Sequence, residues 1–406
     1  MPVLADIGVL ATCAAGAPGA GEVERAAVAF TDGVIRWAGP ESALPAEWAG
    51  EERLDAGGRL VVPGLVDCHT HVVFGGWRAD EFESRLAGRS YQEIAAAGGG
   101  IASTVRRTAE LSEEALRSRA AGFLAEMVRL GVTTVESKSG YGLTPEAELR
   151  MLRVNRRLGR DGPVRIASTL LAHVVPAAER EPARRAVWVA AFARELVPRA
   201  AAERLADACD VYVDSAGAFS PDEARLVLSA ARAAGLAVKL HGDQHSDGGG
   251  AALGAELGAA SVDHLEHAGP AGVAALARSG AVAVTLPIAA LHLRSPFAPA
   301  RALLDAGVPV AVATDFNPGT APSFHLPLAL MLACTAQRMT PAEALRGATL
   351  VAARALGLER VVGSIEPGKA ADLAVIDAPS VAHWLYHFRP NDCVLTLAGG
   401  REAWRA

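Results

Sequence analysis

Lysine is scarce in this chain. Of its 39 basic residues only Lys138, Lys239 and Lys369 are lysines, and the others are arginines. The 45 acidic residues give a formal net charge of −6 at pH 7. Such mild acidity argues against nucleic acid or an anionic membrane surface as the main partner.

Signals for secretion and membrane insertion are also lacking. The five cysteines include no Cys-x-x-Cys pair, so a disulfide framework is not expected and a reducing compartment fits best. The first ten residues, MPVLADIGVL, have no basic segment of the kind that opens a secretory signal. The longest uncharged stretch, 316–337, contains three prolines, which argues against a membrane span. We therefore expect a soluble cytoplasmic protein.

Composition and periodicity indicate a large α/β protein. The 406 residues are 51% hydrophobic and 21% charged, which allows a sizeable core. From about residue 60, short β-rich runs alternate with longer segments of helical apolar spacing. The expected strands are 60–66, 133–137, 164–170, 211–213, 237–241, 260–263, 281–286 and 308–313. Eight strand–helix alternations over roughly 250 residues predict a (β/α)8 TIM-like barrel, with a doubly wound open sheet as the alternative.

The two ends of the chain differ from this alternating region. Residues 1–59 and 355–406 contain short strands separated by glycine turns, and neither end has enough apolar surface to fold alone. We expect both ends to form one small β-sandwich beside a barrel of residues 60–354. Two helix starts are also marked, because Ser220-Pro-Asp-Glu223 and Thr340-Pro-Ala-Glu343 predict capping boxes with proline at the first helical position.

The segment PGLVDCHTH, residues 63–71, is the sharpest sign of chemistry. Side chains alternate along a strand, so His69 and His71 project to the same face. Two imidazoles placed in this way can share one metal ion. A pair of ordinary loop histidines is the alternative.

Three further candidates follow the expected fifth, sixth and eighth strands, namely His241, His264 and Asp315. The carboxyl ends of barrel strands converge on one face, where catalytic groups lie. The spacing therefore predicts one divalent metal held by His69, His71, His241 and Asp315. We expect His264 and Asp315 to move protons for a metal-activated water, although His264 could be a ligand instead. A two-metal site bridged by a carbamylated lysine is disfavoured, because no lysine ends the fourth strand.

Several motifs together resemble the imidazolonepropionase family of the amidohydrolase superfamily. They are CHTHVVFGGWRADEF (68–82), ESKSGYGLT (136–144), KLHGDQ (239–244), SVDHLE (261–266), ATDFNPGT (313–320) and GSIEPGKAADLAVIDAP (363–379). The resemblance implies hydrolysis of the cyclic amide of 4-imidazolone-5-propionate to N-formimidoyl-L-glutamate in histidine degradation. It further implies a zinc or iron ion, the four ligands given above, and a homodimer.

The resemblance also assigns substrate contacts. These fall on Arg78, Tyr91, Tyr141, His173, Asn317, Gly319 and Thr320. The planar guanidinium of Arg78 suits the propionate carboxylate of the substrate. Many relatives have glutamate where this chain has Gln244. A glutamine cannot accept a proton, so we expect Gln244 to serve the catalytic site only by orienting substrate.

Two other hypotheses stay open from the sequence. One is another mononuclear amidohydrolase, such as an aminohydrolase of formimino compounds or nucleobases. Arg78 favours hydrolysis of imidazolonepropionate over that of a nucleobase, because a nucleobase has no carboxylate to pair with the arginine. The other is a metal-free barrel that serves as a binding or scaffold protein, which would require broken ligand positions.

Overall fold

Eight parallel strands form the sheet that positions the site, in a computed structural model that describes residues 2–89, 93–94, 97–214 and 218–406. The strands are hydrogen-bonded in chain order, as the alternating pattern predicted. They are β6 (Leu65–Asp67), β7 (Val132–Lys138), β8 (Arg165–Ala172), β9 (Ala208–Val213), β10 (Ala237–Gly242), β11 (Ser261–His264), β12 (Val282–Thr285) and β13 (Val310–Val312).

The first and last strands of this sheet meet just beyond their carboxyl ends. Thr70 forms a parallel bridge with Phe316, and the backbone N–H of His71 donates to the Phe316 carbonyl at 2.8 Å. Asp67 adds a side-chain link, because its carboxylate accepts from the backbone N–H and the hydroxyl of Thr314. These contacts close the sheet into a barrel and bring the segments after β6 and β13 together.

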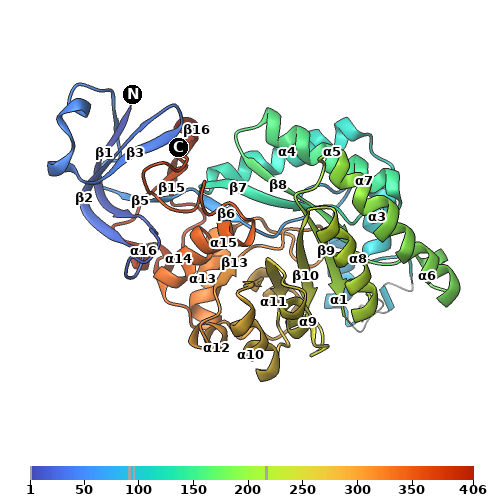
Figure 1. Cartoon of the computed structure of the whole chain (residues 1–406). Helices are drawn as coiled ribbons and strands as arrows, with labels where there is room; N and C mark the ends of the chain where they lie inside the picture. The colour runs from blue at the N-terminus through green and yellow to red at the C-terminus, as the bar shows by residue number, and fades with distance from the viewer. Residues whose placement is uncertain (1, 90–92, 95–96, 215–217) are drawn as a thin grey trace.

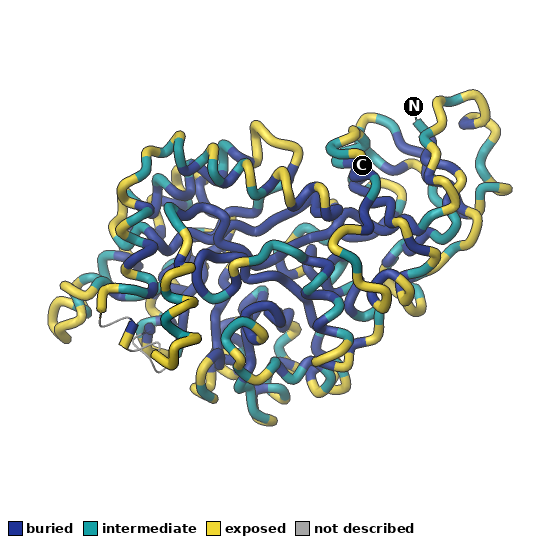
Figure 2. Tube along the Cα trace, turned by 180° about the vertical axis from the view of Figure 1, so that it is seen from behind, coloured by how far each residue is buried: buried dark blue, intermediate teal, exposed yellow. Residues whose placement is uncertain are grey.

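Helices surround the barrel, and exposed residues concentrate on them while the strands inside are buried (Figure 2). The α-helices whose bounds are described are α1 (Ala79–Leu86), α3 (Ile101–Ala109), α4 (Glu113–Arg129), α5 (Pro145–Asp161), α6 (Pro182–Ala191), α7 (Val197–Ala202), α8 (Pro221–Ala233), α9 (Gly250–Glu256), α10 (Pro270–Ser279), α11 (Pro287–Leu293), α12 (Ala300–Asp305), α13 (Leu326–Gln337), α14 (Pro341–Gly347), α15 (Leu350–Ala355) and α16 (Val381–Tyr386). A π-helical turn, Phe192–Leu196, joins α6 to α7.

Helix starts follow the expected sequence signals. Both predicted capping boxes are present, at Ser220 before α8 and at Thr340 before α14. In each box the hydroxyl accepts from the backbone N–H three residues on, and the glutamate there accepts from the backbone N–H of the cap residue. None of the helices in the described ranges combines the length and hydropathy that crossing a bilayer requires.

The chain termini lie in one small β domain at the side of the barrel (Figure 1). Its sheet has the order β16-β15-β14-β5-β1-β2-β3, with β4 paired to β1. These strands are β1 (Val3–Ala11), β2 (Glu22–Thr31), β3 (Val34–Pro40), β4 (Arg53–Asp55), β5 (Leu60–Pro63), β14 (Leu373–Ile376), β15 (Cys393–Ala398) and β16 (Arg401–Arg405). Residues from both ends of the chain, such as Leu4, Phe30, Leu373 and Leu397, share one apolar core.

The single strand predicted over 60–66 is two strands. β5 pairs with β1 and β14 in the terminal sheet, whereas β6 begins the barrel. Gly64 separates them and packs on Thr133, since a Cβ there would lie 2.3 Å from the Thr133 hydroxyl oxygen. A continuous apolar run cannot show where it changes sheets, because both halves are fully buried.

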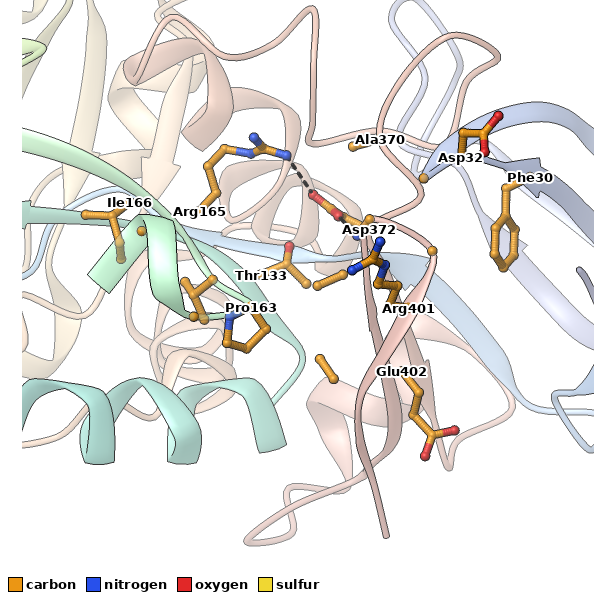
Figure 3. Close-up of a pocket in the computed structure, with 18 of the residues that line it drawn as sticks. Phe30, Asp32, Thr133, Pro163, Arg165, Ile166, Ala370, Asp372, Arg401 and Glu402 are labelled. Carbon is orange, nitrogen blue, oxygen red and sulfur yellow. Dashed lines mark hydrogen bonds and ion pairs between the residues drawn. The ribbon is translucent and has the colours of Figure 1, made fainter. Parts of the chain in front are cut away.

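A cleft of about 1070 Å³ separates the terminal sheet from the start of β7 and β8 (Figure 3). Thr133, Arg165, Asp372 and Arg401 are among its lining residues, and Arg165 lies 3.8 Å from the carboxylate of Asp372. The cleft is at the amino ends of the strands. Catalytic groups of such barrels lie at the opposite, carboxyl ends.

Candidate active site

Four histidines and one aspartate, contributed by four strands, converge at the carboxyl end of the barrel. His69 and His71 follow β6, His241 lies in β10, His264 ends β11, and Asp315 follows β13. None of them is more than 3% exposed. Nε2 of His69 and Nε2 of His71 each lie 3.5 Å from Oδ1 of Asp315. The His241 ring centroid is 4.5 Å from that of His69 and 5.2 Å from that of His264.

These side chains present the atoms that a metal ion needs. Donor atoms of His69, His71 and Asp315 all lie within 4.8 Å of one another, and those of His69, His241 and His264 do the same. Among the described residues, Nε2 of His69 and Nε2 of His241 are buried without a hydrogen-bond partner. Buried polar atoms are nearly always paired in proteins, so two unpaired imidazole nitrogens facing the same cluster favour a bound cation.

Carboxylates hold the other ring nitrogen of two of these histidines. Nδ1 of His69 donates to Asp263 at 2.6 Å, and Nδ1 of His241 donates to Asp210 at 3.0 Å. With the proton on Nδ1, the lone pair is on Nε2, which faces the cluster. Burial, as the largest cause, lowers the pKa of His69 and of His241 below the ordinary value, so both rings are neutral and able to ligate.

A buried charge network lies directly beneath the histidines. Lys138 Nζ lies 2.7 Å from Asp210, 2.9 Å from Glu136 and 3.3 Å from Asp263. Lys239 Nζ lies 2.7 Å from Glu136. These side chains are at most 1% exposed. Although burial raises the pKa of Asp210, the interaction with His241, which includes a hydrogen bond, and the charge of Lys138 outweigh it and hold that pKa below its ordinary range.

His264 is paired differently from the other histidines. Its Nδ1 lies 3.3 Å from Oε1 of Glu266. Burial lowers the pKa of His264, but the nearby carboxylates, first that of Glu266, outweigh it and raise the pKa to about 8. The backbone is unusual here, since φ is +81° at His264 and +57° at Asp315. Non-glycine residues rarely adopt positive φ, and such conformations concentrate at functional sites.

Aromatic rings form one wall of the site. The ring of His173, just after β8, lies 6.0 Å from that of His71 and 5.5 Å from that of Tyr141. The Tyr212 ring, on β9, lies 6.0 Å from both His173 and His241. Burial lowers the pKa of His173 well below its ordinary value, so this imidazole is neutral. The wall therefore offers neutral ring and hydroxyl groups beside the metal-ligand candidates.

Arg78 approaches the same site from the segment after β6. The side chain is buried, and its Nε has no hydrogen-bond partner within the described ranges. Its Nη1 lies 3.7 Å from Oε2 of Glu81. The guanidinium packs on Gly319, and the Arg78 backbone N–H donates to the Pro318 carbonyl at 3.2 Å. A cationic fork with unused donor capacity thus adjoins the loop that begins at Asp315.

Hydrogen bonds within the 315–320 loop fix its shape. Asn317 Oδ1 accepts from the backbone N–H groups of Gly319 and Thr320, and Asn317 Nδ2 donates to the Asp315 carbonyl. The side chain of Asn317 therefore braces the loop on which Arg78 packs.

Gln244 follows β10 and is 8% exposed. Tyr91, the remaining predicted contact, lies outside the described residues.

Several functional candidates were missed by the sequence analysis, namely Glu136, Lys138, Asp210, Tyr212, Asp263 and Glu266. A signal for them was available. Glu136 and Lys138 are two residues apart on β7, and Asp210 and Tyr212 are two residues apart on β9. Residues two apart on a strand share one face, and polar residues placed in this way on a buried strand point into the barrel.

The sequence is similar to those of known enzymes over nearly its whole length. The model of the amidohydrolase family matches residues 60–403. An imidazolonepropionase of Methylobacterium sp. (strain 4-46) is 49% identical over 394 residues, covering 97% of each chain. An imidazolonepropionase of Acidiphilium cryptum is 50% identical over 374 residues, covering 92% of each chain.

Solved structures show the same fold at much lower identity. Atrazine chlorohydrolase from Arthrobacter aurescens, complexed with zinc, has a TM-score of 0.71 at 18% identity, covering 99% of this chain and 95% of that one. An adenosine deaminase from Xanthomonas campestris with bound zinc has a TM-score of 0.71 at 21% identity, covering 99% and 92%. The chain therefore belongs to the amidohydrolase family and, within it, to the imidazolonepropionases.

Proposed function

We propose that this chain hydrolyses the ring amide C–N bond of 4-imidazolone-5-propionate to give N-formimidoyl-L-glutamate. As a member of the amidohydrolase family it is a hydrolase of carbon–nitrogen bonds. The observation that carries the choice of substrate is the position of Arg78. This buried guanidinium packs on the loop that begins at Asp315, so a carboxylate paired with it would place the attached ring next to the histidine cluster.

The residues present fit one divalent cation, zinc or iron, held by His69, His71, His241 and Asp315. The unpaired Nε2 atoms of His69 and His241 support this set, as does the Asp315 oxygen between the first two histidines. When bound, such a cation lowers the pKa of a coordinated water towards about 7 and polarises a carbonyl oxygen. Nitrogen and oxygen donors of this kind accept either metal.

A carbamylated lysine bridging two metals does not fit. Carbamylation requires a neutral amine, whereas Lys138 Nζ contacts three carboxylates. Although burial lowers the pKa of Lys138, these carboxylates outweigh it and raise the pKa well above its ordinary value. The ammonium is therefore charged and already paired, which supports a single cation.

Chemical roles follow from the positions of the side chains. Arg78 binds the propionate, and Tyr141 and His173 contact the ring. His264, held by Glu266, and Asp315 move protons between the water and the leaving ring nitrogen.

The remaining predicted residues complete the pocket in this proposal. Gln244 orients the substrate by hydrogen bonds, and Asn317 with Gly319 and Thr320 shapes the loop beneath Arg78. Tyr91 is assigned a substrate contact on sequence resemblance alone.

The decisive experiment is a direct assay on freshly prepared imidazolonepropionate with the metal-loaded protein. Loss of the ring absorbance and appearance of N-formimidoyl-L-glutamate are expected. Arg78→Ala should raise KM more than it lowers kcat, because it removes a contact to a part of the substrate that does not react. Arg36→Ala, an exposed arginine in the terminal sheet, is the matched control. Turnover of a nucleobase instead, or an unchanged KM in Arg78→Ala, would refute the assignment.

A further inference from the structure

Lys138 is one of three lysines in the chain and lies fully buried inside the barrel. It is the last residue of β7, and its Nζ contacts carboxylates from three strands. The contact distances are 2.7 Å to Asp210 on β9, 2.9 Å to Glu136 on β7 and 3.3 Å to Asp263 on β11. Removing an ammonium from water is costly, and attraction to carboxylates at these distances offsets that cost. The contacts therefore explain how the charge is tolerated there.

Two of these three carboxylates are the ones that hold the histidines. Asp263 accepts from Nδ1 of His69, and Asp210 accepts from Nδ1 of His241. Among the described residues, no other lysine or arginine lies within 4.0 Å of both carboxylates. Lys138 thus connects a histidine after β6 with a histidine on β10 through the carboxylates that hold them.

We propose that Lys138 is a positioning residue for the metal centre: its ammonium binds Asp210 and Asp263 together and thereby sets the orientation of His241 and His69. The inference rests on the metal site of the proposed function. It adds that the affinity of this site for a divalent cation depends on a side chain that is not a ligand.

The physical reason lies in the distance between the two carboxylates. Donor oxygens of Asp210 and Asp263 lie within 4.8 Å of each other, together with a nitrogen of His241. Two like charges this close in a dry interior repel each other strongly unless a cation balances them. Without the ammonium, one carboxylate must turn away from the other, and the Nδ1–H bond of its histidine is weakened or lost. Loss of such an outer partner typically weakens metal binding 10–100-fold.

Lys239 supplies a matched comparison inside the same barrel. It is as buried as Lys138, and its ammonium also contacts Glu136, at 2.7 Å. Its other contact is the backbone carbonyl of Cys68 at 3.4 Å. Within the described ranges its Nζ lies within 4.0 Å of neither Asp210 nor Asp263, although its charge still acts on Asp263 over a longer distance. Lys239→Met therefore removes the same charge and similar volume without breaking the link between the two histidine-holding carboxylates.

The experiment measures zinc affinity of the metal-free full chain by competition with a chromophoric chelator. Lys138→Met should raise the dissociation constant for zinc 10–100-fold, and Lys239→Met should raise it several-fold less. The visible spectrum of bound Co²⁺ should change in Lys138→Met, because the ligand geometry changes. Circular dichroism and the melting temperature of each metal-free variant report whether it folds.

A charge-balanced variant keeps the test valid if Lys138→Met folds poorly. Lys138→Met combined with Asp210→Asn removes one charge of each sign and leaves an oxygen for Nδ1 of His241, so it should regain part of the zinc affinity. Equal dissociation constants for wild type and Lys138→Met, equal losses in the two methionine variants, or no recovery in the double variant would overturn the inference. A wild-type chain that binds no divalent cation would instead refute the proposed function.

Discussion

The guanidinium of Arg78 lies directly against the α-carbon of Gly319. A Cβ built at Gly319 would approach Nη2 of Arg78 to 1.3 Å and its Cζ to 1.8 Å. Since Arg78 is buried, the side chain has little room to move away from such a contact. The absence of a side chain at residue 319 is therefore a condition for the position of the arginine.

Gly319→Ala should weaken substrate binding by displacing the side chain of Arg78. The added methyl group displaces the guanidinium, so the charge-assisted bond to the substrate carboxylate is lost or weakened, at a cost of about 1.5–3 kcal/mol. We expect kcat/KM to fall by about 10–100-fold, mainly through KM. Steady-state kinetics on imidazolonepropionate measure the effect.

Gly122→Ala is the control for that substitution. Gly122 lies within α4, and a Cβ there meets no atom within 4 Å. Alanine is favoured over glycine inside a helix by about 1 kcal/mol, so this variant should be slightly more stable with unchanged kinetics. Wild-type KM in Gly319→Ala would show that the arginine does not depend on this contact.

Metal removal should lower both activity and thermal stability. A cation that binds only the folded chain stabilises it by about 4 kcal/mol when its concentration is 1,000 times its dissociation constant. Protein treated with chelator should melt at a lower temperature and lose turnover, and added Zn²⁺ or Fe²⁺ should restore both. Metal analysis of the treated and restored samples completes the measurement. Full activity in a sample shown to be metal-free would contradict the proposed site.

Asp372 and Asp377 should give opposite pH dependences of stability. Burial, as the main cause, raises the pKa of Asp372 above its ordinary value of 3.8. The folded state therefore binds this proton more tightly than the unfolded state, and stability falls as pH rises from 3.8 through the raised pKa. Hydrogen bonds from Arg59 and Arg389 lower the pKa of Asp377, so its contribution is present above pH 3.8 and lost as pH falls.

Asparagine variants of the two residues test these signs. Melting temperature is measured between about pH 2.5 and pH 8 relative to wild type, so that the scan covers pH values on both sides of 3.8. The difference should become more positive with rising pH for Asp372→Asn, in which an oxygen can still accept the Gly399 N–H, and more negative for Asp377→Asn. Parallel trends in the two variants would show that the environment of Asp372 is not the cause.

The capping box at Thr340 should contribute measurably to stability and not to catalysis. Its Oγ1 accepts from the Glu343 N–H at 3.2 Å. Thr340→Ala removes this acceptor and should cost about 1 kcal/mol of unfolding free energy, whereas Thr340→Ser keeps it. Thermal unfolding of both variants measures the effect. Equal melting temperatures for alanine and serine variants would exclude a role for the hydroxyl.

Much of the barrel and its ligand candidates could be predicted from local pattern. The expected strands overlap the eight observed strands, because buried parallel strands are short apolar runs between helical segments. His69, His71, His241, His264 and Asp315 were found since each stands at or just beyond a strand end. The split between β5 and β6 could not be predicted, because pairing partners decide it and both halves are equally apolar.

Local sequence pattern is enough to place these residues at the carboxyl ends of the barrel strands, since alternation and strand order are local properties of the chain. Which of the residues meet, and with what partners, depends on the closed barrel. Asp210, Asp263 and Lys138 are far apart in sequence, and they form an ion-pair network because all three point into the barrel interior. In that interior the dielectric constant is low, so the energy of each charged group depends strongly on the charges beside it. Spacing along the sequence does not show which charges those are.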